Sequence, residues 1–298
     1  MSLPNEQKGL LLGLLGVIIF SLTLPATRVA VAHFDPFFVG LGRSVLAAGL
    51  AIAVLAVTRS TRPSNAQFKA LLLTSFGVIL GFPALTSWAM RYVPAAHGAI
   101  VVGLLPLATA AMGAWRNHER PSTAFWLWAS VGSGLVIAFA IYDGGGALQW
   151  ADGALLLAVV LGAFGYAEGA RVTRELGGWQ TISWALVVSL PFLLIPVGYF
   201  ATQTNFAVAP WQAWAGFFYV AVLSQYLGFF AWYHALDIGG IARVSQVQLL
   251  QLFFTLGFAA LLLNERITWV MLAFAIAVVV VVMLGRKAPI RRVSHVNQ

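Results

Sequence analysis

The sequence contains no cysteine, and few of its residues carry charge. Charged residues make up 9% of the 298 positions, whereas hydrophobic residues make up 60%. A soluble protein has roughly a quarter of its residues charged, so this composition excludes a soluble fold. The absence of cysteine excludes disulfide bonds, thiol catalysis and cysteine-ligated metal or iron–sulfur sites. We therefore expect an all-α integral membrane protein whose main surroundings are the lipid bilayer.

Long polar stretches are also missing, which leaves no room for a separate soluble domain such as a nucleotide-binding domain. At about 20 apolar residues for each membrane span, a chain of this length holds about ten spans. Charged residues and Pro, Gly or Asn separate ten apolar segments, each long enough to span: 9–31, 36–58, 67–90, 94–115, 122–142, 152–173, 179–200, 210–235, 239–263 and 267–285.

The net charge of +8 does not indicate nucleic-acid binding, because the basic residues are scattered between the apolar segments. With the N-terminus in the cytosol, the inside connections hold Lys8, Arg59, Arg62, Lys69, Arg116, Arg120, Arg171, Arg174, Arg243, Arg286, Lys287, Arg291 and Arg292. The outside connections hold only Arg28, Arg91 and Arg266, together with most acids near span ends, such as Asp143, Asp152 and Glu265. This asymmetry predicts a multi-pass protein of the inner (plasma) membrane with both termini in the cytosol.

An internal repeat divides the chain. An offset of 146 residues aligns 88–138 with 234–284 without a gap and with about ten identities, including Glu119-Arg120 with Glu265-Arg266. The repeat unit holds five predicted spans, an odd number, so the second copy enters the membrane from the opposite side. We predict two inverted five-helix halves, 1–147 and 148–298, around a central cavity. Inverted repeats are typical of secondary transporters that work by alternating access.

Several short motifs resemble those of a known family. The motifs are His118-Glu119-Arg120-Pro121, Asn264-Glu265-Arg266-Ile267, Asp35-Pro36 followed by Arg43, and Ala89-Met90-Arg91-Tyr92-Val93-Pro94. In this pattern the chain resembles, over essentially its whole length, the EamA family of the drug/metabolite transporter superfamily. In general similarity it resembles the bacterial aromatic amino acid exporters of that superfamily. The resemblance implies ten helices in two inverted halves, a central cavity and export of small metabolites, often amino acids. The second half lacks an arginine equivalent to Arg43.

Few charged groups fall inside the spans, and such groups are candidates for function. Arg43 lies about seven residues into its span. It is suited either to bind a substrate carboxylate or to anchor neighbouring helices through backbone carbonyls. Glu168 is the one acid well inside a segment, three residues before Arg171, which leaves a local ion pair and a role in the cavity as alternatives. No acid lies in 9–31, which disfavours a proton-coupled pump for cationic drugs. Because no carboxylate is expected near the middle of the membrane, we predict a facilitative carrier.

Uncharged polar and aromatic residues give the richer signal. With Arg43, the candidates for substrate binding are Trp88, His97, Tyr166, Gln225, Tyr226, Trp232, Tyr233, Gln248 and Gln251. Gln248 and Gln251 share one helical face, and an amide in hydrocarbon needs a hydrogen-bond partner. Hydrogen bonding between helices is the alternative role for each of these polar residues. His97 is predicted to line the outer end of the path, with a structural histidine as the alternative.

Prolines inside spans remove helix hydrogen bonds and permit kinks. Pro25, Pro83 and Pro106 are the candidates for hinges.

These residues predict a carrier for neutral or zwitterionic solutes, most simply amino acids with an aromatic preference, because aromatic side chains stack on apolar ligands. A facilitator of another metabolite or drug, such as a nucleoside or xenobiotic, and a passive channel are the alternatives. An enzyme is not expected, since there is no HExxH motif or reactive Ser/His/Asp group. We expect no catalytic residues, no metal and no cofactor, and a monomer with small-molecule substrates and the bilayer as its partners.

Overall fold

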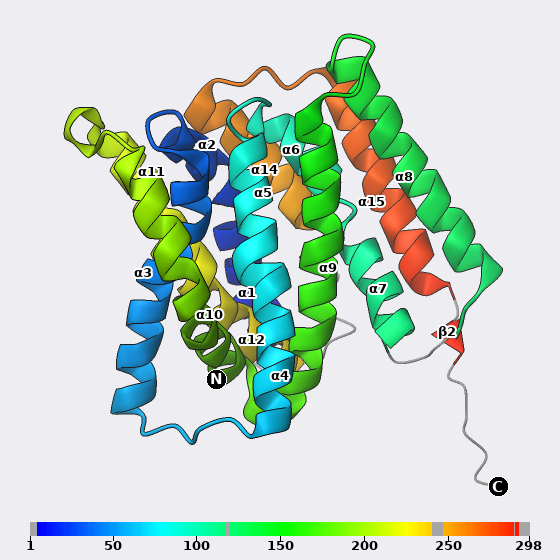
Figure 1. The fold of residues 1–298 in the computed structure, drawn as a ribbon. Helices are drawn as coiled ribbons and strands as arrows, with labels where there is room; N and C mark the ends of the chain where they lie inside the picture. The colour runs from blue at the N-terminus through cyan, green and yellow to red at the C-terminus, as the bar shows by residue number, and fades with distance from the viewer. Residues whose placement is uncertain (1–4, 117–119, 240–246, 289, 292–298) are drawn as a thin grey trace, which may run out of the picture.

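The computed structural model describes residues 5–116, 120–239, 247–288 and 290–291. These residues form a bundle of helices (Figure 1). The first half contains α1 (Asn5–Ser21), α2 (Thr23–Val31), α3 (Pro36–Val57), α4 (Asn65–Thr74), the π-helix η1 (Ser75–Gly81), α5 (Phe82–Ala89), α6 (Ala95–Val102), α7 (Leu105–Arg116), strand β1 (Arg120–Pro121) and α8 (Thr123–Asp143).

The second half of the chain is also mainly helical. It contains α9 (Trp150–Leu176), α10 (Gly178–Thr202), the 3-10 helix η2 (Phe206–Val208), α11 (Trp211–Phe218), the π-helix η3 (Tyr219–Leu227), α12 (Gly228–Gly239), α14 (Leu250–Leu263), α15 (Trp269–Lys287) and strand β2 (Ile290–Arg291). The two short strands pair antiparallel, Arg120 with Arg291.

The apolar segments predicted from the sequence coincide with these helices. Among the described residues, eight helical stretches are long and apolar enough to cross a membrane: Gln7–Val31, Pro36–Val57, Asn65–Ala89, Ala95–Arg116, Thr123–Asp143, Trp150–Leu176, Gly178–Thr202 and Trp211–Trp232. Two further apolar helices, Leu250–Leu263 and Trp269–Gly285, are shorter. Part of the predicted segment 239–263 lies outside the described residues. The chain is thus a multi-pass membrane protein.

The outer surface of the bundle suits lipid. Large apolar side chains such as Ile195 and Leu261 are exposed there, which in water would favour aggregation. Tryptophans near helix ends, among them Trp150 and Trp269, are also exposed, and tryptophan at such positions is typical of the membrane interface.

The helices pair in a pattern that joins the two halves. Helix α1 packs along α12, α3 along α10, α6 against α14 and α8 along α15, whereas α4, η1 and α5 pack along α9. The α2–α3, α5–α6, α8–α9 and α14–α15 connections lie together at the upper end in Figure 1, here called the α8–α9 end. Helix α1 begins, and α15 ends, toward the opposite, α3–α4 end.

The contact of η1 with α9 depends on glycine. A Cβ atom on Gly77 would lie 2.3 Å from the carbonyl oxygen of Leu161, and one on Gly165 would lie 2.8 Å from the backbone nitrogen of Val78. Only glycine permits this approach, because real Cβ atoms do not come so close to backbone atoms. Small residues bring helices together in this way in membranes, and the close packing fixes one wall of the cavity described next.

Candidate functional site

A pocket lies between the two halves, where α1 and α2 meet α3, α5, α6, α9, η3 and α14. The empty space between its lining side chains is about 920 Å³, including the part that is open to the outside. Both halves contribute to its wall, which consists of Phe20, Thr23, Leu24, Arg43, Val78, Phe82, Ala99, Val102, Gly103, Leu105, Pro106, Tyr166, Ser224, Gln225, Phe229, Gln248, Leu249, Gln251, Leu252, Thr255 and Val279.

Two turns between or before helices lie at the pocket, one in each half of the chain. Turns at Gly103–Leu104 separate α6 from α7, and turns at Gln248–Leu249 precede α14. Shifting 103–104 by 146 residues gives 249–250, within one residue of the second turn. Gly103, Gln248 and Leu249 all line the pocket. Irregular backbone at membrane depth is tolerated where it lines a cavity, and paired interruptions of this kind mark the binding sites of many transporters.

A buried arginine and a buried glutamine form the polar centre of the pocket. Arg43 lies on α3 and Gln225 on η3, and they are 4% and 1% exposed. The Arg43 Nε–H donates to Gln225 Oε1 at 2.9 Å, and Nη2–H donates to the same oxygen. The sequence left two roles open for Arg43, and the structure gives it a side-chain partner in the pocket rather than backbone carbonyls.

The pair keeps donors that nothing in the described part of the chain satisfies. Arg43 Nη1 and Gln225 Nε2 are buried and have no acceptor among the described residues. Within those residues no Asp or Glu lies at ion-pair distance from Arg43. A buried guanidinium without an anion is costly, so these two donors are available to an acceptor in the pocket.

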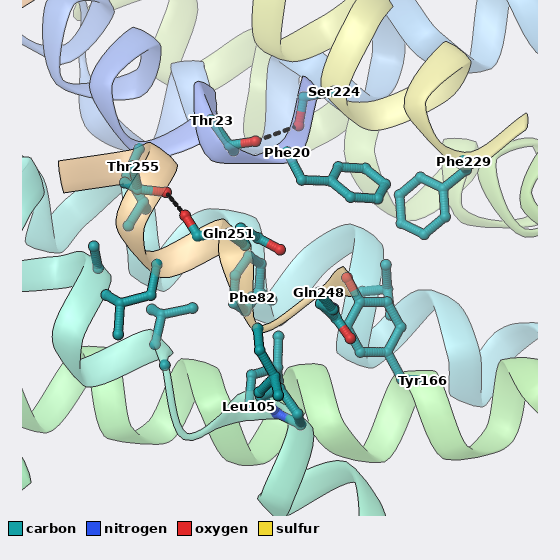
Figure 2. A pocket seen from close by; sticks show the side chains of 18 of the residues that line it. Phe20, Thr23, Phe82, Leu105, Tyr166, Ser224, Phe229, Gln248, Gln251 and Thr255 are labelled. Carbon is teal, nitrogen blue, oxygen red and sulfur yellow. Dashed lines mark hydrogen bonds between the residues drawn. The ribbon is translucent and has the colours of Figure 1, made fainter. Parts of the chain in front are cut away.

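Aromatic rings form much of the remaining wall. The rings of Phe20 and Phe229 meet edge to face with centroids 5.1 Å apart, and Tyr166 lies 6.4 Å from Phe229. Figure 2 shows Phe20 and Phe229 side by side, with Phe82, Tyr166 and Gln248 among the other lining side chains. Such rings bind flat apolar or aromatic groups.

Hydroxyl and amide groups complete the lining. The Thr23 and Ser224 hydroxyls are hydrogen-bonded at 2.7 Å across α2 and η3, and the Thr255 hydroxyl donates to the backbone carbonyl of Gln251 at 2.8 Å. Gln248 and Gln251 both line the pocket, from positions in and just after the turn before α14 (Figure 2). The pocket therefore offers acceptors as well as donors.

Five of the residues predicted for substrate binding meet in this pocket: Arg43, Tyr166, Gln225, Gln248 and Gln251. Trp88 does not reach it. It lies at the end of α5, where its ring packs against Tyr92 with centroids 4.9 Å apart, and it lines a separate surface hollow beside His33 and Arg91. The position of Trp88 near the helix end, past the level of the pocket, accounts for the difference.

His97 is buried in a cluster with two aspartates and does not line the pocket. Its Nδ1 lies 2.6 Å from Asp143 Oδ2, and its Nε2 lies 2.6 Å from Asp152 Oδ1. The ring is 2% exposed and packs near Phe139 on α8. These contacts join α6 to the end of α8 and the start of α9.

Two predicted residues, Tyr226 on η3 and Trp232 on α12, also have other surroundings. The buried Tyr226 hydroxyl is hydrogen-bonded to Ser183 on α10 at 3.0 Å. Trp232 is buried between α12 and α1, beside Val17. Both point away from the pocket because neighbouring helical positions differ by about 100° in direction. Tyr233 was also predicted, and its side chain lies outside the described part of the structure.

The three predicted hinge prolines all follow an interruption. Pro83 and Pro106 occupy the second positions of α5 and α7, directly after η1 and after the Gly103–Leu104 turn. Pro25 lies in the first turn of α2, after the break at Leu22. At the start of a helix the missing proline N–H costs no hydrogen bond, so proline is compatible with each of these interruptions. Pro106 also lines the pocket.

Glu168 takes part in ion pairs away from the pocket. Its Oε1 accepts from Arg116 Nε on α7, and its Oε2 lies 3.5 Å from Arg171 Nη1 on its own helix. The local pair with Arg171 is thus present, together with a second partner, Arg116, on another helix. The part of the chain that the structure describes contains no group of three His, Cys, Asp or Glu residues arranged to hold a metal ion.

Sequence reasoning missed several lining residues. Phe20, Phe82 and Phe229 lie in apolar segments, where the sequence does not distinguish a ring facing a cavity from one facing lipid. Thr23 and Ser224 carried a weak signal as polar residues inside spans, and their mutual hydrogen bond identifies the wall that they form.

Comparisons with known proteins agree with this architecture. The model of the EamA-like transporter family matches residues 7–142 and again 149–285. The chain is 44% identical over 283 residues to the uncharacterized transporter YdeK of Bacillus subtilis (strain 168), covering 95% of this chain and 98% of YdeK. It is 23% identical over 240 residues to the uncharacterized transporter YyaM of the same organism, covering 78% of this chain and 79% of YyaM.

A solved crystal structure shares the fold. It superposes with a TM-score of 0.62 at 15% sequence identity, over 94% of this chain and 98% of the other. At that level of identity the likeness concerns the fold alone.

Proposed function

The chain belongs to the EamA-like transporter family, and on this basis we propose that it is a secondary carrier that exports amino acids, with a preference for aromatic side chains. The observation that carries the proposal is the pocket between the halves, with the unsatisfied donors of Arg43 and Gln225 beside aromatic rings. The confirmed family resemblance and the names of the relatives indicate a transporter rather than an enzyme.

Alternating access by two inverted five-helix halves, with ten spans in all, is the proposed mechanism. If each helix is replaced by the equivalent helix of the other half, the contact of α1 with α12 becomes the contact of α9 with α5, which is also present. The contacts α3–α10, α6–α14 and α8–α15 each join a helix to its own equivalent in the other half. The two π-helices also occupy equivalent positions in the two halves. Shifting η1 (Ser75–Gly81) by 146 residues gives 221–227, which lies inside η3 (Tyr219–Leu227). The double match to the family model supports the same division.

Two such halves have two related arrangements of similar energy, each opening the pocket to one side. Pro25, Pro83 and Pro106, next to interruptions in α1–α2, η1–α5 and α6–α7, are proposed as the hinges. We place both termini and the α3–α4 end in the cytosol of an inner membrane, because most of the arginines and lysines outside the spans lie at that end. The pocket is complete within one chain, which suits a monomer.

The chemistry of the lining determines the proposed substrate. A carboxylate accepts from Arg43 Nη1 and Gln225 Nε2, and planar carboxylates are the natural acceptors for a guanidinium. The ammonium group donates to side-chain oxygens of Gln248, Gln251 or Thr23, and an aromatic side chain packs against Phe20, Phe229 and Tyr166. A zwitterion satisfies the donors, acceptors and rings at once.

Counterflow in proteoliposomes tests this function. Vesicles loaded with unlabelled phenylalanine are expected to take up labelled phenylalanine transiently, with saturation, whereas vesicles loaded with uridine are not. Saturable counterflow is the property of a carrier, because a passive channel gives no transient accumulation. Counterflow supported equally by uridine would favour a nucleoside facilitator, and uptake that never saturates would favour a channel.

A further inference from the structure

The cluster of His97, Asp143 and Asp152 is not used by the proposed transport mechanism. His97 and Asp152 are 2% and 1% exposed, and Asp143 is 23% exposed. The three side chains come from three elements, the first turn of α6, the last residue of α8 and the first turn of α9. They lie at the α8–α9 end and are absent from the wall of the central pocket.

The geometry of this cluster fixes the number of its hydrogens. Each contact joins a ring nitrogen to a carboxyl oxygen at 2.6 Å, so each requires a hydrogen between the two atoms. The other oxygen of Asp152, Oδ2, accepts from the Gln149 backbone N–H at 2.8 Å. Asp152 Oδ2 is thus an acceptor. A neutral imidazole has a single N–H, so the second hydrogen is one additional proton, carried by the ring as an imidazolium or by one of the carboxyl groups.

Few other charged groups face the imidazole from the elements that pack on α6, which are α2, α8, α9, α14 and α15. Arg28 on α2 and Glu265 before α15 form an ion pair at 3.4 Å, and Glu265 accepts from the backbone N–H groups of Ala95 and Ala96. Helix α14 has no titratable side chain, and Arg286 and Lys287 lie at the far end of α15. The groups in direct contact with His97 are thus the two aspartates.

The same short helix connects this cluster with the pocket. Helix α6 begins two residues before His97, and its later residues Ala99 and Val102 line the pocket. A change in how the start of α6 is held therefore changes one wall of the pocket. If the extra proton leaves, one ring nitrogen of His97 faces a carboxylate oxygen with no hydrogen between them. The two lone pairs then repel each other, and an attractive contact is lost.

We propose that His97, Asp143 and Asp152 form a proton-binding site that ties α6 to α8 and α9, and that loss of its proton lets the α8–α9 end open toward the pocket. The opening step rests on the proposed carrier function, whereas the proton-binding site rests on the cluster alone. The ligand is a single proton held as imidazolium between two carboxylates.

The absence of natural cysteines makes a sensitive test available. A chain with Thr255→Cys carries one thiol in the pocket wall, and an impermeant thiol reagent supplied at the α8–α9 end reports how open that end is. Asp152→Asn is the key variant, because the amide N–H donates to His97 Nε2 and both contacts then hold without the extra proton. Since thiol reactivity itself rises with pH, rates are expressed relative to this variant.

We compare the labelling rate of the Thr255→Cys parent chain with that of the same chain carrying Asp152→Asn. Between about pH 6 and about pH 9, this ratio is expected to rise on the order of tenfold, because one charge-assisted hydrogen bond is lost. His97→Gln is expected to label quickly at every pH. His33→Gln, at an exposed histidine of the same end, is expected to match the parent. A ratio that stays constant over this range would overturn the opening step.

Nitrogen NMR of the imidazole tests the site independently of transport. Two ring N–H signals from His97 are expected for the parent chain at the acidic end of the range, and one for Asp152→Asn. One N–H signal for the parent over the whole range would overturn the site. Failure of phenylalanine counterflow would instead contradict the proposed function and leave these ring signals unchanged.

Discussion

Replacing Arg43 by glutamine is expected to weaken phenylalanine binding by at least about 30-fold. Removing one partner of a buried, hydrogen-bonded charge pair costs about 2 to 5 kcal/mol, and each 1.4 kcal/mol is a factor of ten. Arg43 meets the condition, because it is buried and its Nη1 has no acceptor among the described residues. Equilibrium binding of labelled phenylalanine to the purified protein measures the effect.

Phenylalaninamide separates loss of the carboxylate contact from general damage to the pocket. It keeps the ring and the ammonium but lacks the carboxylate, so it is expected to bind weakly to the parent protein and to be nearly insensitive to Arg43→Gln. Arg59→Gln is the matched control, because Arg59 is exposed just beyond the end of the same helix. Equal losses for phenylalanine and its amide would refute a carboxylate role for Arg43.

Replacing Glu265 by alanine is expected to raise labelling of Thr255→Cys from the α8–α9 end at least about tenfold. The Glu265 carboxylate accepts from the first two N–H groups of α6, both at 2.8 Å, and pairs with Arg28 Nε at 3.4 Å. It thereby ties the α14–α15 connection of the second half to α6 and α2 of the first. Each charge-assisted hydrogen bond contributes about 1.5 to 3 kcal/mol, and losing both favours the arrangement open at this end.

Glu175→Ala is the control for this experiment. Glu175 is exposed at the opposite end, where it accepts a hydrogen bond from Gln67, so its loss is not expected to raise labelling from the α8–α9 end. Arg28→Gln is expected to act in the same direction as Glu265→Ala, with a smaller effect because the α6 contacts remain. Unchanged labelling in Glu265→Ala would show that this contact does not hold the end closed.

The sequence was sufficient to locate the apolar helices. Runs such as 36–58 and 179–200 coincide with α3 and α10, because a membrane span has a fixed minimum length and an apolar composition. The Glu-Arg motif indicated the repeat, and Glu265 has a role at the junction of the halves. Arg43 and Gln225 were predicted as site residues because polar side chains inside spans need a partner, and both line the pocket.

The direction in which each polar side chain points could not be predicted from the sequence. Gln225 and Tyr226 are adjacent, yet Gln225 meets Arg43 and Tyr226 meets Ser183, since consecutive residues face different directions. The partners of His97 lie 46 and 55 residues away at the ends of α8 and α9. Only the packing of three helices brings them together. The sequence therefore did not reveal the two carboxylates beside His97 when it was predicted to line the outer end of the path.

Substrate protection of a cysteine in the pocket tests the central claim, that one site between the halves binds the solute and opens to either side. In proteoliposomes containing the Thr255→Cys chain, the thiol is expected to react with an impermeant reagent applied at either face. Saturating phenylalanine is expected to slow both reactions, and phenylalaninamide to slow neither. Reaction from one face only, or no protection by phenylalanine, would contradict the account.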